Sequence, residues 1–370
     1  EAMEAMTKAL TEGWANPSAL YTFGIDAAHA LRNARMAVAK AMGAEPDRVF
    51  FTSGGTEADN WAIFGTAKRF GKRGKHIITT AIEHHAILNP MKELEAQGFE
   101  VTYLQPDSLG RITLDTLKAA LRKDTILVSV MMVNNETGAL YSVAKAFSLI
   151  KSKYPDAITH CDAIQAFLRV DFTPKSLCAD LISVSGHKVH APKGVGALYV
   201  NQELIKAKKI VPFLRGGGQE SGMRSGTENV IGICAFGAAV EDYYKNRTAI
   251  NARIAELYDY ATERLAALGV RVNVPAETRV NHIINVTLPN IKSETMLHLL
   301  SADGIFVSSG SACASHASTP SGSLIAFGLP PAEADCSIRI SLSRYNTKDD
   351  IDALCESLAK GLERLVRIKR

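Results

Sequence analysis

The stretch SVSGHKVHAPKGVGALYV, residues 183–200, places Lys188 on a turn between two apolar segments. These segments, 181–186 and 196–200, predict short strands of a sheet. Glycines on both sides of the lysine leave little side-chain bulk around it. A surface lysine needs no such surroundings, whereas a lysine that bonds covalently to a flat ligand needs bare backbone for the ligand to lie against. The stretch therefore predicts a strand, turn and strand that present a reactive lysine.

Strands and helices alternate on the amino-terminal side of this turn. Apolar segments predict strands at 48–52, 76–81, 100–104, 125–133 and 157–162. Helical periodicity predicts helices at 26–43, 56–70, 87–98 and 114–123. The strand at 125–133, TILVSVMMV, lacks polar alternation, as expected when both faces are covered. The pattern predicts an α/β fold with a large, doubly wound, mostly parallel sheet.

This rhythm changes near residue 245, where a long charged helix covering 251–269 is expected to begin. We therefore expect a large ligand-binding domain at 1–245, whose first residues could instead join the second domain, and a smaller α+β domain at 246–370. A chain of 370 residues with 46% hydrophobic residues is long enough to bury two cores.

The amino-acid composition indicates which binding partners and which cellular compartment to expect. Charged residues make up 22% of the chain, and the net charge of +4 comes from interleaved acidic and basic residues, so neither nucleic acid nor a membrane surface is an expected partner. No apolar run approaches the roughly 18 residues of a membrane span. Six scattered cysteines in a chain of this size favour the reducing cytoplasm.

Candidate site residues follow the predicted strands, because ligands of open α/β sheets bind beyond the carboxyl ends of the strands. Gly55 and Thr56 open a helix after 48–52, where free N–H groups suit a phosphate, although most such loops are ordinary turns. Asp162 could keep a ring nitrogen protonated or could cap a helix. Asn135 could donate to a ring substituent or could belong to a turn. Taken with Lys188, the set matches what pyridoxal 5'-phosphate requires.

Eight motifs extend this interpretation over nearly the whole chain. They are FTSGGTEADN, EHHAIL, VNNETG, HCDAIQA, SGHKVHAPKGVGALYV, GGGQESGMRSGTEN, SSGSACAS and SIRISLSRYNT. Their order and spacing resemble those of cysteine desulfurases of the NifS/IscS type, which are fold-type I pyridoxal-phosphate enzymes of the class V aminotransferase group. The resemblance implies a seven-stranded sheet in the large domain and a homodimer.

The resemblance also implies roles for individual residues. Lys188 would form the Schiff base and move the substrate's α-proton, Asp162 would pair with the pyridine nitrogen, and His84 would stack on the ring and assist proton transfer. Gln165 and Asn135 would reach the ring oxygen. The phosphate would be held by Gly55, Thr56, Ser185 and His187.

Three further residues would complete the site. Thr227, in RSGTEN, would reach the phosphate of the other subunit's cofactor. Arg339 would clamp the carboxylate of L-cysteine, with Asn135 nearby, since a guanidinium binds carboxylates in bidentate fashion. Cys313, in the small and polar run 308–329, would receive the substrate's sulfur as a persulfide on a movable loop and pass it to an acceptor protein, such as an iron–sulfur scaffold. The other five cysteines are expected to be inert packing residues.

Alternatives remain open at this stage. A selenocysteine lyase or an aminotransferase of the same fold would use Lys188 and Asp162 without needing Cys313 to accept sulfur, and a non-enzymatic relative would have lost turnover. A zinc site formed by the motif histidines would need paired cysteine or carboxylate ligands, which the pattern lacks, so no metal is expected. The sequence departs from the family at Tyr21 and Ser221, where histidine and arginine are common, and an amino-terminal DNAATT-like segment is missing.

Overall fold

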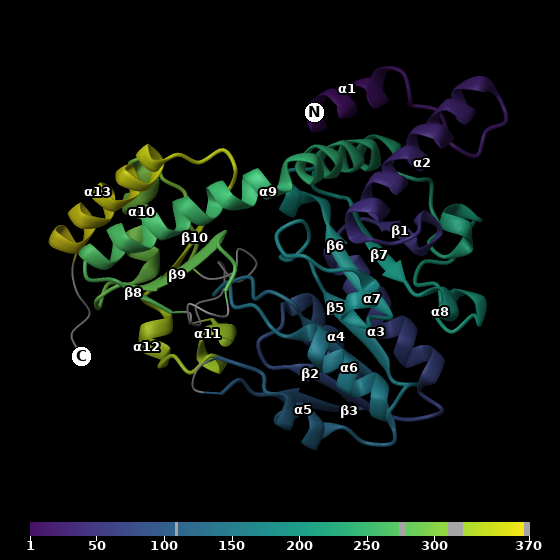
Figure 1. The fold of residues 1–370 in the computed structure, drawn as a ribbon, viewed down its shortest axis with the longest axis horizontal. Coiled ribbons are helices and arrows are strands. Elements are labelled where there is room, and N and C mark those ends of the chain that lie inside the picture. Colours follow the sequence, from purple (N-terminus) through teal and green to yellow (C-terminus); the bar gives the residue numbers. More distant parts are fainter. Residues whose placement is uncertain (108–109, 274–278, 310–320, 366–370) are drawn as a thin grey trace. The chain divides into compact units, whose positions relative to one another are not determined.

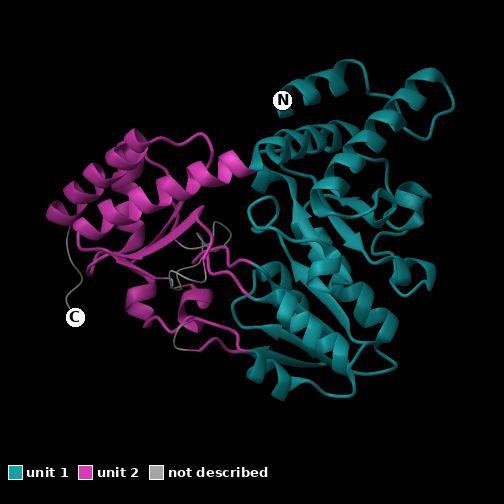
Figure 2. Ribbon diagram, viewed as in Figure 1, with its two compact units in different colours: residues 1–104, 114–132, 142–247 teal, residues 105–113, 133–141, 248–370 magenta. Residues whose placement is uncertain are grey.

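The structure is a computed structural model that describes residues 1–107, 110–273, 279–309 and 321–365. It contains two compact units (Figure 2). Unit 1 comprises residues 1–104, 114–132 and 142–247, and unit 2 comprises residues 105–113, 133–141 and 248–370.

A seven-stranded sheet forms the centre of unit 1 (Figure 1), with strand order β1-β7-β6-β5-β4-β2-β3. Its strands are β1 (Val49–Thr52), β2 (His76–Thr80), β3 (Glu100–Leu104), β4 (Thr125–Met131), β5 (Ile158–Asp162), β6 (Leu181–Ser185) and β7 (Gly196–Val200). Neighbours from β3 to β6 are parallel, and β7 is antiparallel to both β6 and β1. The predicted mostly parallel α/β sheet is confirmed.

Helices precede, connect and follow these strands. They are α1 (Ala2–Thr11), α2 (Thr22–Met42), α3 (Gly55–Phe70), α4 (His85–Ala96), α5 (Leu114–Ala120), α6 (Val143–Lys153), α7 (Pro174–Leu177) and α8 (Gln202–Lys206), with short 3₁₀ turns at Pro46–Arg48, Gly186–Val189 and Gln219–Gly222. Helix α3 packs on the sheet through Trp61, Ala62 and Ile63, which are fully buried. Every residue of β4 is buried, which explains its unbroken apolar sequence.

Unit 2 is built on a three-stranded antiparallel sheet in the order β10-β9-β8. Its strands are β8 (Arg271–Val272), β9 (Ile283–Thr287) and β10 (Ser337–Ser341), and its helices are α10 (Ser293–Ala302), α11 (Gly322–Ala326), α12 (Pro331–Ala334) and α13 (Lys348–Arg364). Helices α10 and α13 pack so closely that a Cβ at Gly361 would lie 2.6 Å from Met296 Sδ. Glycine at that position permits the contact.

Three predicted boundaries are wrong. Helix α2 begins at Thr22 rather than at Asp26, the predicted cap. Helix α9 (Val230–Ala267) begins 21 residues before the predicted helix at 251–269 and continues through residue 245. Its first turns, VIGICAFGAAV, lack the polar face by which an amphipathic helix is recognised. The predicted flexible run 308–329 also includes α11, and Ser308 pairs with Arg339 in an antiparallel bridge.

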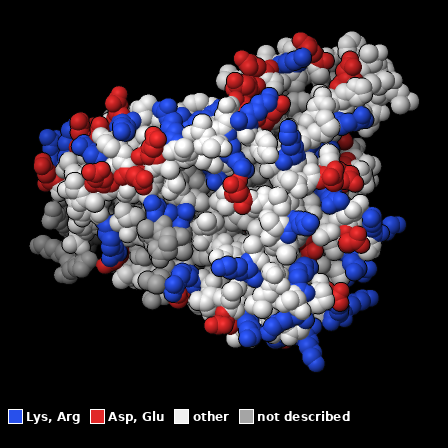
Figure 3. All heavy atoms as spheres, in the orientation of Figure 1, with Lys and Arg blue, Asp and Glu red and all other residues white. Residues whose placement is uncertain are grey.

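Surface character follows the composition. Figure 3 shows basic and acidic side chains interspersed over the visible face. Among the described residues, no helix combines the length and the apolar character needed to cross a bilayer.

Candidate functional site

The turn from β1 to α3 forms a close-packed cradle of backbone. A Cβ on Gly55 would lie 2.2 Å from Ile164 Cδ1, and a Cβ on Gly196 would lie 2.7 Å from the Gly54 carbonyl carbon. Side chains at these two glycines would therefore displace the turn or its neighbours. The unpaired N–H groups at the start of α3, with the exposed Thr56 beside them, can bind a phosphate.

An ion pair fixes the same helical turn. The Glu57 carboxylate accepts two hydrogen bonds from Arg224, at 2.8 and 3.0 Å, and one from the Ser53 N–H at 2.9 Å. Arg224 therefore balances the acidic charge beside the cradle. It also ties the RSGTEN segment to α3, and Thr227 of this segment is exposed.

Lys188 lies in a tight 3₁₀ turn, Gly186–Val189, directly after β6. A Cβ on Gly186 would lie 3.0 Å from Val195 and 3.2 Å from Phe236, so the turn has little room for a side chain there. Ser185 Oγ and His187 Nδ1 share a hydrogen bond of 2.9 Å. Lys188 is half-buried. The predicted phosphate-binding residues Ser185 and His187 thus lie directly before Lys188 at the same turn.

Asp162 ends β5 and is 5% exposed. Its Oδ1 accepts the Ile164 N–H at 2.9 Å, and Gln165 follows on the same turn. Burial raises the pKa of Asp162 to about 6, and the nearby Lys188 ammonium opposes that rise. A positive group bound against this carboxylate would offset the cost of burying its charge.

His84 occupies the N-cap position of α4, where its Nδ1 accepts the Ala86 N–H at 3.1 Å. Burial lowers the pKa of His84 to about 4, with smaller contributions from His85, Lys188 and His187. The ring is therefore neutral at pH 7. Because Nδ1 accepts a hydrogen bond, the proton of the neutral ring lies on Nε2.

Two predicted substrate residues meet within unit 2. Arg339 on β10 donates from Nη1 to the Asn135 carbonyl at 2.9 Å and from Nη2 to Ser308 Oγ at 3.3 Å. Asn135 is 8% exposed, and its side-chain oxygen has no hydrogen-bond partner within the described part of the chain. Cys313 lies outside the described residues.

The residues of unit 1 fit pyridoxal phosphate. The cradle at Gly55 excludes side-chain bulk, and Lys188 is near enough to influence Asp162 and His84. Within the described ranges, the buried Asp162 carboxylate forms no ion pair. A protonated pyridine nitrogen is the kind of group that Asp162 can stabilise, and the α3 N-terminus suits the phosphate.

Sequence reasoning missed several buried polar residues near this site. Asp59 and Glu83 belong to quoted motifs or adjoin them but received no role, and His160 lies two residues before Asp162. Glu220 is buried and accepts two hydrogen bonds from Arg35, at 2.7 and 2.6 Å. For His160, the available signal was an imidazole inside the predicted strand 157–162. The departures Tyr21 and Ser221 are both exposed.

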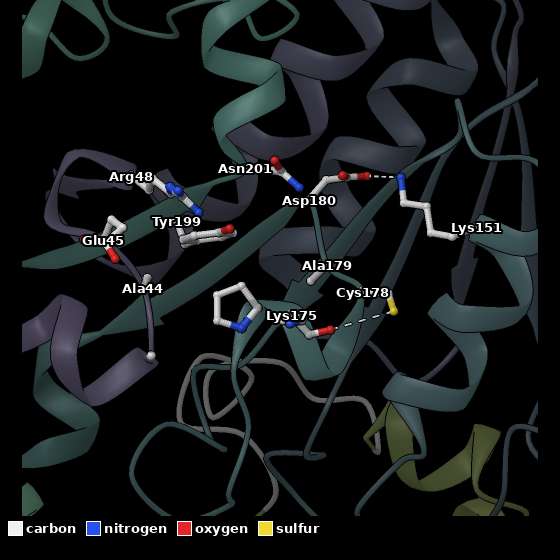
Figure 4. Close-up of a pocket in the computed structure, with 12 residues that line it drawn as sticks. Ala44, Glu45, Arg48, Lys151, Lys175, Cys178, Ala179, Asp180, Tyr199 and Asn201 are labelled. Atoms are coloured by element: carbon white, nitrogen blue, oxygen red, sulfur yellow. Dashed lines mark hydrogen bonds and ion pairs between the residues drawn. The ribbon is translucent and has the colours of Figure 1, made fainter.

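A separate pocket of about 480 Å³ lies in unit 1 (Figure 4). It shares no residue with the predicted site, and Asp180 in its wall precedes the start of β6, whereas Lys188 follows its end. Lys151 forms an ion pair with Asp180 there. Cys178 also lines this pocket, and Cys178 and Cys234 are both partly exposed.

Comparisons with known proteins agree with this geometry. The model of the aminotransferase class-V family matches residues 1–354. The chain is 42% identical over 366 residues to a protein named cysteine desulfurase IscS from Methanosarcina thermophila, covering 99% of this chain and 89% of that protein. It is 43% identical over 364 residues to a protein of the same name from Clostridium botulinum (strain Hall), covering 97% and 90%.

Solved structures give the same result. A structure titled NifS-like protein superposes with a TM-score of 0.92 at 36% identity, covering 98% of this chain and 96% of that chain. A structure titled SspA in complex with cysteine has a TM-score of 0.81 at 34% identity, covering 94% and 96%. The chain thus belongs to the aminotransferase class-V family and, within it, to the pyridoxal-phosphate-dependent cysteine desulfurases.

Proposed function

We propose that this enzyme converts L-cysteine to L-alanine and places the released sulfur on Cys313. The substrate's carbon–sulfur bond breaks, a sulfur–sulfur bond forms on Cys313, and the β-carbon gains a proton. The observation that carries the proposal is the convergence of Lys188, Asp162 and His84 beside the glycine cradle in unit 1. When bound, pyridoxal phosphate supplies an electron sink for the α-carbon of the substrate.

In this proposal, individual residues of the chain bind the cofactor and the substrate and transfer the α-proton. Lys188 holds the cofactor covalently and moves the α-proton, and Asp162 keeps the ring nitrogen protonated. Gln165 and Asn135 bind the ring oxygen, and the phosphate is held by Gly55, Thr56, Ser185 and His187. Arg339 binds the substrate carboxylate through its planar guanidinium. The contact between Arg339 and the Asn135 carbonyl supports this role, because it fixes the orientation of the guanidinium.

The protonation state of His84 bears on how Cys313 is activated. A thiol is only a few per cent ionised near neutral pH, so a base must accept its proton. His84 is neutral with its proton on Nε2, which makes it a donor at that atom. We therefore assign the proton of Cys313 to the substrate amine, and we assign to His84 the stacking contact and a hydrogen bond donated from Nε2.

The proposal extends to partners and location. Thr227 reaches the cofactor phosphate of a second subunit, so the working enzyme is a homodimer. The Cys313 persulfide is passed to an acceptor protein for iron–sulfur clusters or other sulfur-containing products. The five cysteines of the described chain are all free thiols, which supports a cytoplasmic location.

Product balance tests the proposal. Wild type, Cys313→Ser and the matched control Cys178→Ser are each given L-cysteine with a thiol reductant, and alanine and sulfide are measured. We expect equal amounts of both products from wild type and Cys178→Ser. We expect Cys313→Ser to form neither while it retains the visible band of the cofactor. Unchanged products from Cys313→Ser would point instead to a lyase or aminotransferase that does not use this thiol.

A further inference from the structure

Besides the adjacent Cys161, whose thiol pKa is raised by burial, three ionisable side chains are buried close to Asp162. Asp59 on α3 and His160 on β5 have no exposed surface, and Glu83, just before α4, is 1% exposed. Asp59 and Glu83 both interact electrostatically with Asp162 and with each other. We call Asp59, Glu83, His160 and Asp162 the buried acid cluster.

His160 brings no positive charge to this cluster. Its Nδ1 lies 2.9 Å from Ser129 Oγ, and its Nε2 lies 3.0 Å from Ser183 Oγ and 3.7 Å from Asp59 Oδ1. Burial lowers the pKa of His160 to about 3, so the ring is neutral at pH 7. His160 thus connects the Ser129 hydroxyl on β4 with the Ser183 hydroxyl on β6, the two strands on either side of β5. Its neutral ring also lies beside Asp59.

Glu83 and Asp59 also lack a cationic partner among their described contacts. Glu83 Oε1 accepts hydrogen bonds from Thr80 Oγ1 at 2.7 Å and from the Met131 N–H at 2.8 Å, while Oε2 is buried without a partner. The Ser183 hydroxyl lies near enough to favour the charged form of Asp59, but neither Asp59 oxygen forms a hydrogen bond of good geometry in the described part of the chain. An ionised carboxylate in such a place is unfavourable, and the group takes up a proton instead.

Asp162 is the member best able to hold a negative charge. It accepts a backbone N–H, lies near Lys188, and is the strand-end residue assigned to the ring nitrogen of the cofactor. Burial and the Asp162 charge raise the pKa of Asp59 well above its usual range, and burial raises that of Glu83 to about 8. Neighbouring carboxylates resist ionising together, so charge on one member keeps the others protonated.

We propose that Asp59 is a positioning residue that stays a neutral carboxylic acid, so that the negative charge of the buried acid cluster is carried by Asp162. The proposal rests on the role assigned above to Asp162. Asp59 shares helix α3 with the glycine cradle at Gly55, so one helix both presents the phosphate-binding N–H groups and places a buried acid within electrostatic range of the ring-nitrogen carboxylate. A second buried charge at Asp59 would favour proton uptake by Asp162 and weaken its hold on a protonated ring nitrogen.

Infrared spectroscopy and the cofactor band test this in the holoenzyme. Wild type should show the carbonyl band of a protonated carboxylic acid at pH 7, part of which disappears in Asp59→Asn. The visible cofactor band of Asp59→Asn should titrate with the wild-type midpoint, because an amide reproduces a neutral acid. Asp59→Ala should shift that midpoint, because it removes the buried acid beside His160 and leaves a cavity near Asp162 that water can enter. Asp162→Asn, as the positive control, should abolish the wild-type titration.

Thermal stability gives a readout that does not depend on turnover. An unfolded aspartate ionises near pH 4, whereas the folded Asp59 keeps its proton, so this group's contribution to stability falls as the pH rises above about 4. Asparagine has no such dependence. The melting temperature of Asp59→Asn relative to wild type should therefore increase from pH 5 to pH 8. The matched control, Asp180→Asn, removes an ion pair with Lys151 and should lower the melting temperature at both pH values.

Specific results would overturn the proposal. For Asp59→Asn, they are an unchanged infrared band, loss of the cofactor titration as in Asp162→Asn, or a melting temperature relative to wild type that falls as the pH rises. For Asp59→Ala, the contradicting result is a cofactor titration with the wild-type midpoint. Failure of the proposed desulfurase activity would appear separately, as absence of alanine and sulfide from the wild type. The infrared and melting measurements would keep their meaning in that case.

Discussion

At the scale of single residues, the chemistry depends on which groups are charged. Lys188 and Asp162 could be identified from the sequence because each follows or ends a buried strand. The protonation state of His84 could not, since it depends on burial and on the Ala86 N–H that its Nδ1 accepts. The same holds for Asp59 and Glu83, whose surroundings come from strands far apart in the sequence.

The lowered pKa of His84 predicts an effect of acid on stability. An unfolded histidine takes up a proton near pH 6.5, whereas the folded His84 resists protonation down to about pH 4, so stability is lost as the pH falls through this interval. His84→Asn keeps an N-cap acceptor and cannot be protonated. The melting temperature of His84→Asn relative to wild type should be more favourable at pH 5 than at pH 7.

A control at the exposed neighbouring position separates this effect from surface charge. His85→Asn should leave the melting temperature close to that of wild type at both pH values. A relative melting temperature of His84→Asn that does not change between pH 7 and pH 5 would mean that the folded ring takes up a proton as readily as the unfolded one.

At the scale of elements, one buried ion pair secures the segment between β7 and α9. Glu220 lies in the left-handed region, with φ of 50°, and its carboxylate accepts two hydrogen bonds from Arg35 and one from the Phe51 N–H at 2.8 Å. It thereby joins this segment to helix α2 and strand β1. Thr227 lies further along the same segment, so the pair holds in place the chain that presents it.

Removing one partner of this ion pair should lower the stability of the folded protein. Glu220→Ala leaves Arg35 without its carboxylate and the Phe51 N–H without its acceptor, and we expect a loss of about 3 kcal/mol in the free energy of unfolding. Urea denaturation measures this loss as a lower midpoint. Glu203→Ala, at an exposed ion pair with Lys206, should change stability by less than about 0.5 kcal/mol. Equal effects of the two variants would contradict the structural role of Glu220.

Whether a helix or strand could be predicted from the sequence depends on the pattern that its burial leaves in the sequence. The strands of the large sheet were predicted within about two residues because short apolar segments bounded by turns have few other uses. The start of α9 was missed because its first turns are buried on most sides, so no polar face marks them as helical. Helix α11 was missed because serines, glycine and proline precede it and predict only a loop.

At the scale of the whole molecule, our proposal places Thr227 in the cofactor site of a second copy of the chain. Thr227 is exposed in the single chain, and Arg224 and Glu57 anchor the segment that carries it. A hydroxyl that donates to a phosphate forms a hydrogen bond to a charged group, which contributes about 1.5–3 kcal/mol. Thr227→Ala should therefore weaken the binding of pyridoxal phosphate by roughly 10- to 100-fold.

Cofactor titration and sedimentation together test this prediction. Wild type and Thr227→Ala should both sediment as dimers, while only the variant should lose affinity for the cofactor. Thr248→Ala, in helix α9, removes a threonine hydroxyl from an exposed position outside the RSGTEN segment. It serves as the matched control and should retain wild-type affinity. Wild-type cofactor affinity in Thr227→Ala, or a monomeric wild type, would contradict the shared site.

The central claim is that Cys313 receives the sulfur, and the mass of the protein after a single exposure to L-cysteine tests it most directly. The holoenzyme is mixed with L-cysteine without reductant, alkylated, digested and analysed by mass spectrometry. The account predicts one added sulfur atom on the peptide that contains Cys313, together with an equal amount of alanine. Alanine formed while that peptide stays unmodified, or sulfur added to Cys178 instead, would contradict it.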